Sequence, residues 1–401
     1  MKKLISLMLL LLMMTPCLRA QRKEISQARS YLKSGKDLDK AGKLIEELLA
    51  KDSVNRNNPR LYALLYQIVQ KQYSEGNEKL YLKEKYDTAS LFNLTKRMFG
   101  IASTLDTLDA LPDRKGRVRL DYRRKNAAEL NGYRPNLYNG GVFFARRGDY
   151  ATAFSFFDAY LASGCLPLFG AYDYLKTDGR MVSAAYWAVH CGFKLRDASK
   201  ILNHYELARR DTSKLRFVLR YAAEAYVMTD NDSAYVTTLQ EGFGKYPKFK
   251  YFFSRLIDYY TRKGRLETAL AVADSALAVD GRDELFLLAK STVLLNLGKN
   301  DSCISLSDSL ISINDSLAEA YFNAGTAYLN KILTLEGGME NSRANRQKIR
   351  ELYRLACPYI ERYRELMPAD KEKWAPALYR IYLNLNMGSK FEEVDRILNA
   401  Q

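Results

Sequence analysis

The chain reads YFFSRLIDYYTRKGRLETALAVADSALAVDG from residue 251 to residue 281 and LFLLAKSTVLLNLGKNDSCISLSDSLISIND from residue 285 to residue 315, and these stretches align without a gap at an offset of 34 residues. Residues of similar kind recur at that spacing on both sides of the pair. The three sets in register are Leu219, Phe253, Leu287 and Tyr321, then Ala223, Ile257, Ser291 and Gly325, and then Tyr226, Tyr260, Leu294 and Tyr328. A fixed period of this length indicates a repeat architecture.

The spacing within one period predicts two helices that pack on each other. The three sets lie four and then three residues apart, which places them on one face of a helix. Gly264 and Gly298 can adopt the backbone values that end that helix in a tight turn. Small residues such as Ala269 and Ala273 then let the second helix pack closely on the first. A helical hairpin of this kind cannot bury its apolar face alone, so it must stack on its neighbours.

These positions resemble the tetratricopeptide repeat (TPR) family, whose signature is a 34-residue helix-turn-helix. Further copies are recognisable at 137–161 and, with one extra residue, at 181–205. The last copy fits only with an insertion of 19 residues, at about 330–348, where Gly337 and Gly338 mark a loop tip. The resemblance covers about two thirds of the chain and implies a right-handed solenoid.

The sequence therefore predicts an all-α fold, a right-handed TPR-like helical-hairpin solenoid with a divergent helical N-terminal region. The chain has only nine prolines and few runs of alternating β-branched residues, which argues against a sheet. We expect three segments: a signal peptide at 1–20, the divergent region at 21–134 and the repeat solenoid at 135–401, which includes the insertion.

The first twenty residues are typical of a secretory signal peptide. Two lysines, Lys2 and Lys3, precede an apolar run from Leu4 to Met14, which is too short to be a stable membrane anchor. We place cleavage after Ala20. The alternative is lipidation of Cys17, although Pro16 fits a lipidation motif poorly. No later stretch approaches the roughly 20 apolar residues of a membrane helix, so we expect no transmembrane segment after signal removal.

The net charge narrows the class of binding partner, and the cysteine count bears on whether disulfides form. The formal net charge is +16, and removal of the signal peptide leaves +13, which favours an acidic partner, an anionic lipid surface or a polyanion. Four cysteines remain in an exported chain, Cys165, Cys191, Cys303 and Cys357. Their even number permits disulfides, and four buried free thiols are the alternative.

Motifs for catalysis are missing from the sequence. Only two histidines occur, His190 and His204, and neither lies in a G-x-S-x-G or H-E-x-x-H motif. The Gly-Lys pair in KSGKDLD (33–39) lacks the rest of a phosphate loop. We therefore expect no enzyme activity, no cofactor and no metal site.

The family resemblance implies a concave groove lined by the first helix of each pair. Lys and Asn four residues apart on that helix form the family's carboxylate clamp, and here Ser254/Asp258, Leu288/Thr292 and Phe322/Thr326 stand instead, so the clamp is absent. The matching positions predict these groove residues for partner binding: Phe217, Arg220, Glu224, Tyr251, Ser254, Asp258, Arg262, Thr292, Asn296, Thr326 and Asn330.

A second candidate contact is the basic stretch PDRKGRVRLDYRRK (112–125), which has seven Lys or Arg and two Asp. If a helix covers 117–131, Arg119 and Arg123 share one face, as do Arg117 and Arg124, and they form a basic stripe. A solvated helix face and a contact for an acidic protein or lipid headgroup are the two interpretations. Nucleic acid is not an expected partner, because the chain is exported and has no nucleic-acid-binding motif.

We interpret the protein as an exported, non-enzymatic TPR scaffold that mediates protein–protein interaction in the periplasm or at the outer membrane. A long rigid surface suits extended or helical segments of another protein. The chain resembles large signal-bearing TPR proteins of Gram-negative bacteria. The alternative is a protein that binds glycan or an anionic envelope polymer.

Overall fold

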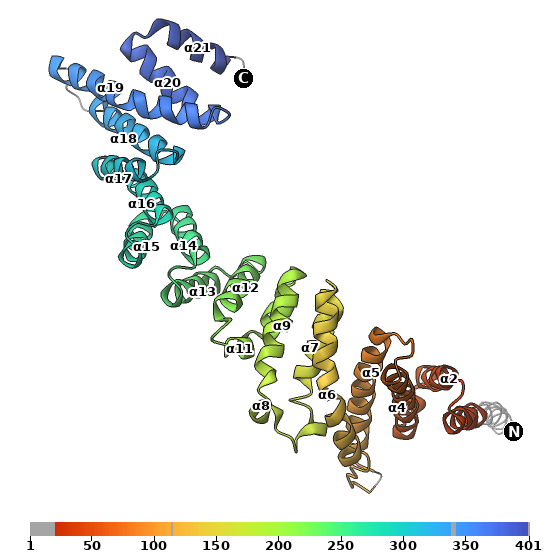
Figure 1. Cartoon of the computed structure of the whole chain (residues 1–401). Coiled ribbons are helices and arrows are strands. Elements are labelled where there is room, and N and C mark those ends of the chain that lie inside the picture. Colours follow the sequence, from red (N-terminus) through yellow and green to blue (C-terminus); the bar gives the residue numbers. More distant parts are fainter. Residues whose placement is uncertain (1–20, 114, 338–341, 400–401) are drawn as a thin grey trace, which may run out of the picture. The chain divides into compact units, whose positions relative to one another are not determined.

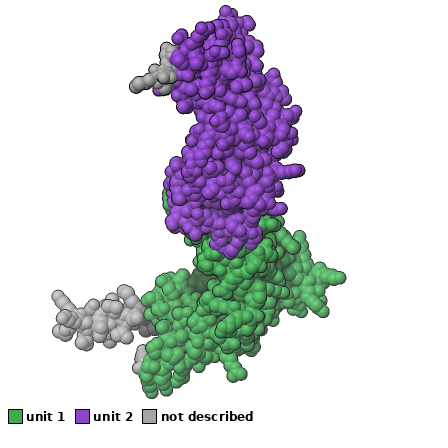
Figure 2. Space-filling view, turned by 90° about the vertical axis from the view of Figure 1, so that its left-hand side faces the viewer, with its two compact units in different colours: residues 1–230 green, residues 231–401 purple. Residues whose placement is uncertain are grey.

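The computed structural model describes residues 21–113, 115–337 and 342–399, so the expected signal peptide with Cys17 lies outside the described residues. All regular elements in these ranges are helices, which confirms the all-α prediction. The chain divides into two compact units, Met1–Asp230 and Asn231–Gln401, coloured separately in Figure 2. We refer to them as the first and the second unit.

The first unit is built of successive antiparallel helices (Figure 1). Residues 21–34 are helical. The elements that follow are α2 (Leu38–Lys51), α3 (Ser53–Arg56), α4 (Pro59–Tyr81), α5 (Thr88–Asp109), α6 (Arg123–Arg146), α7 (Tyr150–Ala162), the 3₁₀ turn η1 (Pro167–Phe169), α8 (Tyr174–Thr177), α9 (Arg180–Lys194), α10 (Ala198–Asn203), α11 (Tyr205–Ala208) and α12 (Leu215–Met228).

The second unit contains more regular pairs, drawn from green to blue in Figure 1. Its helices are α13 (Asp232–Lys245), α14 (Lys250–Arg262), α15 (Leu266–Val279), α16 (Glu284–Asn296), α17 (Asn300–Ile313), α18 (Ala318–Glu336), α19 (Arg343–Leu366), α20 (Lys371–Leu385) and α21 (Gly388–Asn399).

The turns between paired helices form where the repeat register predicts them. Gly264 and Gly298 have φ values of 69° and 70°, a region that favours glycine, and each separates two helices. Behind these turns Ala269, Ala273 and Cys303 are fully buried, as expected for the small positions of the second helices. The 34-residue period therefore determines both where each helix ends and which face it buries.

The inserted residues near the C-terminus lengthen two helices. The first helices α14 and α16 have 13 residues each, whereas α18 has 19. Its partner α19 has 24 residues. Of the expected loop tip, Gly337 follows α18 directly and Gly338 lies outside the described residues. The insertion thus extends the α18–α19 hairpin, because most of its residues continue the helical hydrogen bonding of the two helices.

The expected boundary at 134/135 falls inside α6, a continuous helix. The boundary between the two compact units of the structure lies elsewhere, between Asp230 and Asn231. The boundary at 134/135 therefore stays a prediction about how regular the repeats are in sequence. In the described part of the chain, no helix is both long enough and apolar enough to cross a lipid bilayer.

Candidate functional site

A groove opens in the second unit over the two first helices α14 and α16. It encloses about 570 Å³. Its lining residues are Phe253, Ser254, Arg255, Ile257, Asp258, Thr261, Arg262, Leu285, Leu288, Ala289, Thr292 and Val293. We call this feature the α14–α16 groove. Its volume lies within the range of about 300–1,000 Å³ that is usual for ligand pockets.

The amphipathic pattern of α14 explains which side chains reach the groove. Phe252, Phe253, Leu256 and Tyr260 are buried against the neighbouring helices. The positions Ser254, Asp258 and Arg262 recur every four residues and so share another face of the same helix. The helix therefore offers a polar row to the groove while its apolar row holds the repeat together.

The floor of the groove is apolar and firmly packed. Phe253 and Val293 are each only 1% exposed. The ring of Phe253 lies 4.5 Å from the ring of Phe286, centroid to centroid, and Phe286 belongs to the next first helix. Because these anchors are fixed in the core, the half-buried Ile257 and Leu288 above them present a preformed apolar surface.

The rim of the groove carries charges of both signs. Asp258, Arg262 and Arg255 are exposed. Arg262 Nε donates a long hydrogen bond of 3.4 Å to the backbone oxygen of Asp258. Within the ranges that the structure describes, the Asp258 carboxylate has no ion-pair partner. The rim can therefore pair with charges on a bound segment at little cost in internal contacts.

A buried polar network positions Thr292 at the groove. Asn323 Nδ2 donates to Thr292 Oγ1 at 3.0 Å and to Ser291 Oγ at 3.2 Å. Ser291 Oγ also lies 2.8 Å from Ser307 Oγ, and all of these except Thr292 are buried. Thr292 Oγ1 donates in turn to the Leu288 backbone oxygen at 3.1 Å. The network explains why serine fills the small position of α16.

The structure brings together only part of the predicted groove set. Ser254, Asp258, Arg262 and Thr292 line the α14–α16 groove. The others lie outside it: Phe217, Arg220 and Glu224 on α12 in the first unit, Tyr251 at the start of α14, Asn296 at the end of α16, and Thr326 and Asn330 on α18. Arg255 and Ala289 also line the groove and were not among the predicted residues. They are 34 residues apart and each directly follows a first-helix groove position, so the repeat register could have identified them. Whether any of these residues binds a partner stays a prediction.

The basic stretch differs from its expected helical form. Helix α6 begins at Arg123, so Arg117 and Arg119 do not belong to a helix face. Asp113 is the cause, because its Oδ1 accepts hydrogen bonds from the Lys115 and Arg117 backbone N–H groups at 2.8 and 3.0 Å. Gly116, with a φ of 75°, completes this tight turn. The prediction of a helix from residue 117 is wrong for this reason.

Two of the four arginines in the predicted basic contact are engaged internally. Arg123 forms a bidentate pair with the buried Asp106, with hydrogen bonds of 2.7 and 2.9 Å. Arg117 pairs with Asp113 at 3.0 Å. Arg119 and Arg124 are exposed and have no side-chain partner among the described residues. The available positive charge is therefore smaller than the sequence count indicates.

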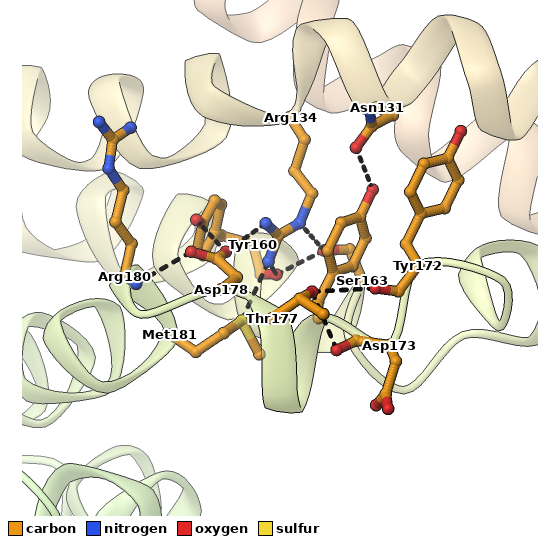
Figure 3. Close-up of polar contacts among 11 residues, drawn as sticks. Asn131, Arg134, Tyr160, Ser163, Tyr172, Asp173, Thr177, Asp178, Arg180 and Met181 are labelled. Atoms are coloured by element: carbon orange, nitrogen blue, oxygen red, sulfur yellow. Dashed lines mark hydrogen bonds and ion pairs between the residues drawn. The ribbon is translucent and has the colours of Figure 1, made fainter.

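A buried arginine cluster in the first unit was not predicted from the sequence (Figure 3). Arg134 of α6 forms an ion pair with Asp178, and its Nε donates to Ser163 Oγ at 2.7 Å. The rings of Tyr160 and Tyr174 cover the guanidinium at 3.9 and 3.8 Å. The cluster ties the irregular segment between α7 and α9 to the first helix of the preceding pair. We interpret it as structural, because its polar groups are satisfied by one another.

Both histidines have packing roles. His190 Nδ1 lies 3.1 Å from Tyr221 Oη, and burial, together with the nearby Lys194 charge, lowers the pKa of His190. His204 Nε2 lies 2.7 Å from Asp158 Oδ1. In the described part of the chain, no group of three or more His, Cys, Asp or Glu side chains is placed to hold a metal ion.

The repeat geometry identifies the architecture. Paired helices follow one another at the predicted 34-residue spacing, with turn glycines at Gly264 and Gly298. The fold is tetratricopeptide-like. No family model matches the chain, and no curated protein matches it. Among solved structures, the chain is similar to the C-terminal part of a TPR repeat-containing protein from Cytophaga hutchinsonii, with 12% identity and a TM-score of 0.45 over 64% of this chain and 92% of the other.

Two further TPR structures show weaker likeness. Yeast Tom70 is 11% identical, with a TM-score of 0.34 over 91% of this chain and 96% of its own. YrrB, described as a TPR protein with an unusual peptide-binding site, is 15% identical, with a TM-score of 0.26 over 62% of this chain and 94% of its own. At these identities no residue role transfers to this TPR-like chain.

Proposed function

We propose that the protein is an exported, non-enzymatic scaffold whose α14–α16 groove binds a segment of another protein. The observation that carries the proposal is an apolar floor with exposed charges of both signs at its rim, on adjacent first helices. A bound helical or extended segment would place an aliphatic or aromatic side chain over Ile257 and Leu288. Its charged neighbours would pair with Asp258 and Arg262.

The export part of the proposal rests on residues 2–20 of the sequence. Two lysines, an apolar run and a small residue before Gln21 support translocation and cleavage. We propose the periplasm or the inner side of the outer membrane as the site of action. The non-enzymatic part is supported by the internal contacts of His190 and His204.

A photo-crosslinking residue at Ala289, on the groove wall, tests the site directly in cells. The matched position is Ser275, which is exposed on the second helix α15. We expect a discrete crosslinked species from position 289 and none of the same mass from position 275. Equal crosslinking at both positions would exclude the groove as the specific site.

Charge reversal tests the rim. We expect Asp258→Lys and Arg262→Glu each to reduce the crosslinked species about tenfold, because rim pairs contribute about 1 kcal/mol or more when a partner desolvates them. Glu319→Lys and Arg282→Glu reverse equivalent exposed charges outside the groove and should have no effect. If the groove and control variants behave alike, the groove has no role in recognition.

A glycan-binding or anionic-polymer-binding role is the second candidate, favoured by aromatic side chains on α9. Tyr186 and His190 lie two repeat lengths, 68 residues, before Ser254 and Asp258, so they occupy the equivalent groove positions of an earlier first helix. Trp187 lies beside them, with its ring 5.6 Å from that of His190. Intact mass discriminates the two candidates: a chain starting at Gln21 weakens the capture role, whereas a diacylated chain starting at Cys17 would support it.

A further inference from the structure

The connection between α5 and α6 lies at one end of a helical hairpin (Figure 1). Its sequence brings apolar and cationic side chains into one short segment. Leu111, Val118 and Leu120 are 59%, 55% and 40% exposed. Lys115, Arg119 and Arg124 are exposed as well. We call these six residues the α5–α6 tip. Arg114 lies outside the described residues and is not part of it.

The tip carries a surplus of positive charge after its internal pairs are counted. Asp113 is committed to Arg117, and Asp106 to Arg123. Asp109 accepts a hydrogen bond from the Tyr122 backbone N–H at 3.1 Å. That neutral donor leaves the charge of Asp109 in place, so three cations, Lys115, Arg119 and Arg124, face two acids, Asp109 and the exposed Asp121. The surplus is one positive charge. The tip is therefore suited to a negatively charged partner surface.

The backbone of the tip is organised before any partner binds. The Asp113 N–H donates to the Arg117 carbonyl oxygen at 2.9 Å, which closes the turn. The Asp113 carboxylate accepts two more backbone N–H groups, and these hydrogen bonds lower its pKa. Because the turn is fixed by its own hydrogen bonds, the segment that carries Val118 and Leu120 loses little conformational entropy when it binds a partner.

A cavity of about 660 Å³ opens beside the tip. Leu120 and Arg124 belong to its wall, together with small or apolar residues of α6 such as Ala127 and Ala128. Leu168, in the 3₁₀ turn η1 after α7, also lines the cavity. An apolar wall with an unpaired guanidinium beside it matches a ligand that joins an anionic group to an apolar body.

We propose that the α5–α6 tip docks the protein on a membrane surface that contains anionic phospholipids. Leu111, Val118 and Leu120 enter the interfacial layer, while Lys115, Arg119 and Arg124 contact the phosphate groups. Cations flanked by exposed aliphatic side chains are the combination that binds such interfaces. A protein partner fits less well, because the tip offers only a small contact area for a specific protein–protein interface. A bilayer is deformable and can bind the tip without a complementary shape.

Vesicle flotation tests the proposal. The protein is purified as the cell processes it, and all variants are compared in the same form, so any contribution of residues 1–20 is common to them. We expect binding to vesicles of phosphatidylglycerol and phosphatidylcholine, and at least tenfold weaker binding to phosphatidylcholine alone. At 1 M salt the binding should fall sharply, because the Debye length shrinks to about 3 Å. No binding to the anionic vesicles overturns the proposal and leaves an acidic protein as the partner.

Two variants separate the charged from the apolar part of the tip. Arg119→Glu/Arg124→Glu should weaken partitioning more than tenfold, because two cations that attract the phosphate groups become anions that repel them. Val118→Ser/Leu120→Ser should weaken it at least tenfold, since two exposed aliphatic side chains no longer enter the interfacial layer. If the serine variant binds as tightly as the parent, insertion is wrong and only surface adsorption remains.

Matched controls exclude general effects of charge and hydrophobicity. Lys248→Glu/Arg282→Glu reverses two exposed cations of the second unit, and Val279→Ser/Ile313→Ser removes two side chains that are 42% and 52% exposed. Both controls should bind like the parent. Full competition by millimolar inorganic phosphate would also overturn membrane docking, because it would identify the cavity as a site for the free anion.

Discussion

Arg134 and Asp178 form an ion pair between helix α6 and the residue that directly precedes the turn into α9, with side chains that are 6% and 16% exposed (Figure 3). The two residues are 44 positions apart in the sequence. Tyr160 Oη donates to the same Asp178 oxygen at 2.5 Å. The pair therefore closes an irregular segment that the repeat pattern does not specify, and much of the local stability should depend on it.

Removal of the arginine should destabilise the first unit strongly. We expect Arg134→Met to lower the free energy of unfolding by about 3–5 kcal/mol, because it leaves the Asp178 carboxylate buried without its counter-charge. Urea unfolding measures the change, and hydrogen exchange across 163–179 locates it. Arg117→Met is the control, since its pair with Asp113 is 54% and 35% exposed and should contribute little to the free energy of unfolding. Equal losses in the two variants would contradict a special role of the buried pair.

The same pair predicts a pH dependence. Burial alone would raise the pKa of Asp178, but hydrogen bonds from Tyr160 and Arg134 outweigh it and hold the pKa below its ordinary value. A lowered pKa contributes stability that is complete above the unfolded value of about 3.9 and is lost as the pH falls through the folded value. The stability difference between the parent and Asp178→Asn should therefore be largest near pH 7 and shrink below about pH 4. Urea midpoints from pH 7 to pH 3 check this, and a constant difference would contradict it.

Substitution by alanine should change the stability of the protein in opposite directions at two glycines of α13. A Cβ at Gly242 would lie 2.6 Å from Cζ of Phe252, a ring that is fully buried, whereas a Cβ at Gly244 meets nothing within 4 Å. We expect Gly242→Ala to cost about 1–3 kcal/mol through overpacking. Gly244→Ala should be neutral or stabilising by about 0.5 kcal/mol, because alanine favours the helix. Thermal melts of the two variants measure both effects, and two variants with the same sign of change would refute the packing argument.

The four cysteines should differ in reactivity. All are free thiols in the structure, with Cys165 exposed and the others buried. Burial raises the pKa of Cys191 to about 12, and burial with the nearby Glu361 raises that of Cys357 to about 11. We expect iodoacetamide at pH 8 to modify Cys165 within minutes and the other three only in urea, because the thiolate is the reactive form. Peptide mapping by mass spectrometry identifies the modified residue. Rapid native labelling of Cys191 would show that its repeat opens readily.

Several features were predictable because they depend on local spacing. The positions of Gly264 and Gly298, and the burial of Ala269 and Cys303, follow from a 34-residue period and the geometry of a helical hairpin. Groove residues such as Asp258 could be named from the same register, since positions four apart share a helix face. The start of α6 could not be predicted in this way. The Asp113 side chain accepts hydrogen bonds from the backbone and so stabilises a turn in place of a helix, and the spacing of residues on a helix gives no information about that alternative.

The sequence by itself determined the repeat length, the helix faces and the all-α class, because each depends on residues within one or two periods of one another. The tertiary structure decided which of these residues share a cavity and which charges are already paired. Arg123 appears free in the sequence and is bound to Asp106, and Arg134 meets Asp178 only through an irregular connection. Such contacts depend on how neighbouring helices stack, and stacking fixes distances that a one-dimensional pattern does not contain.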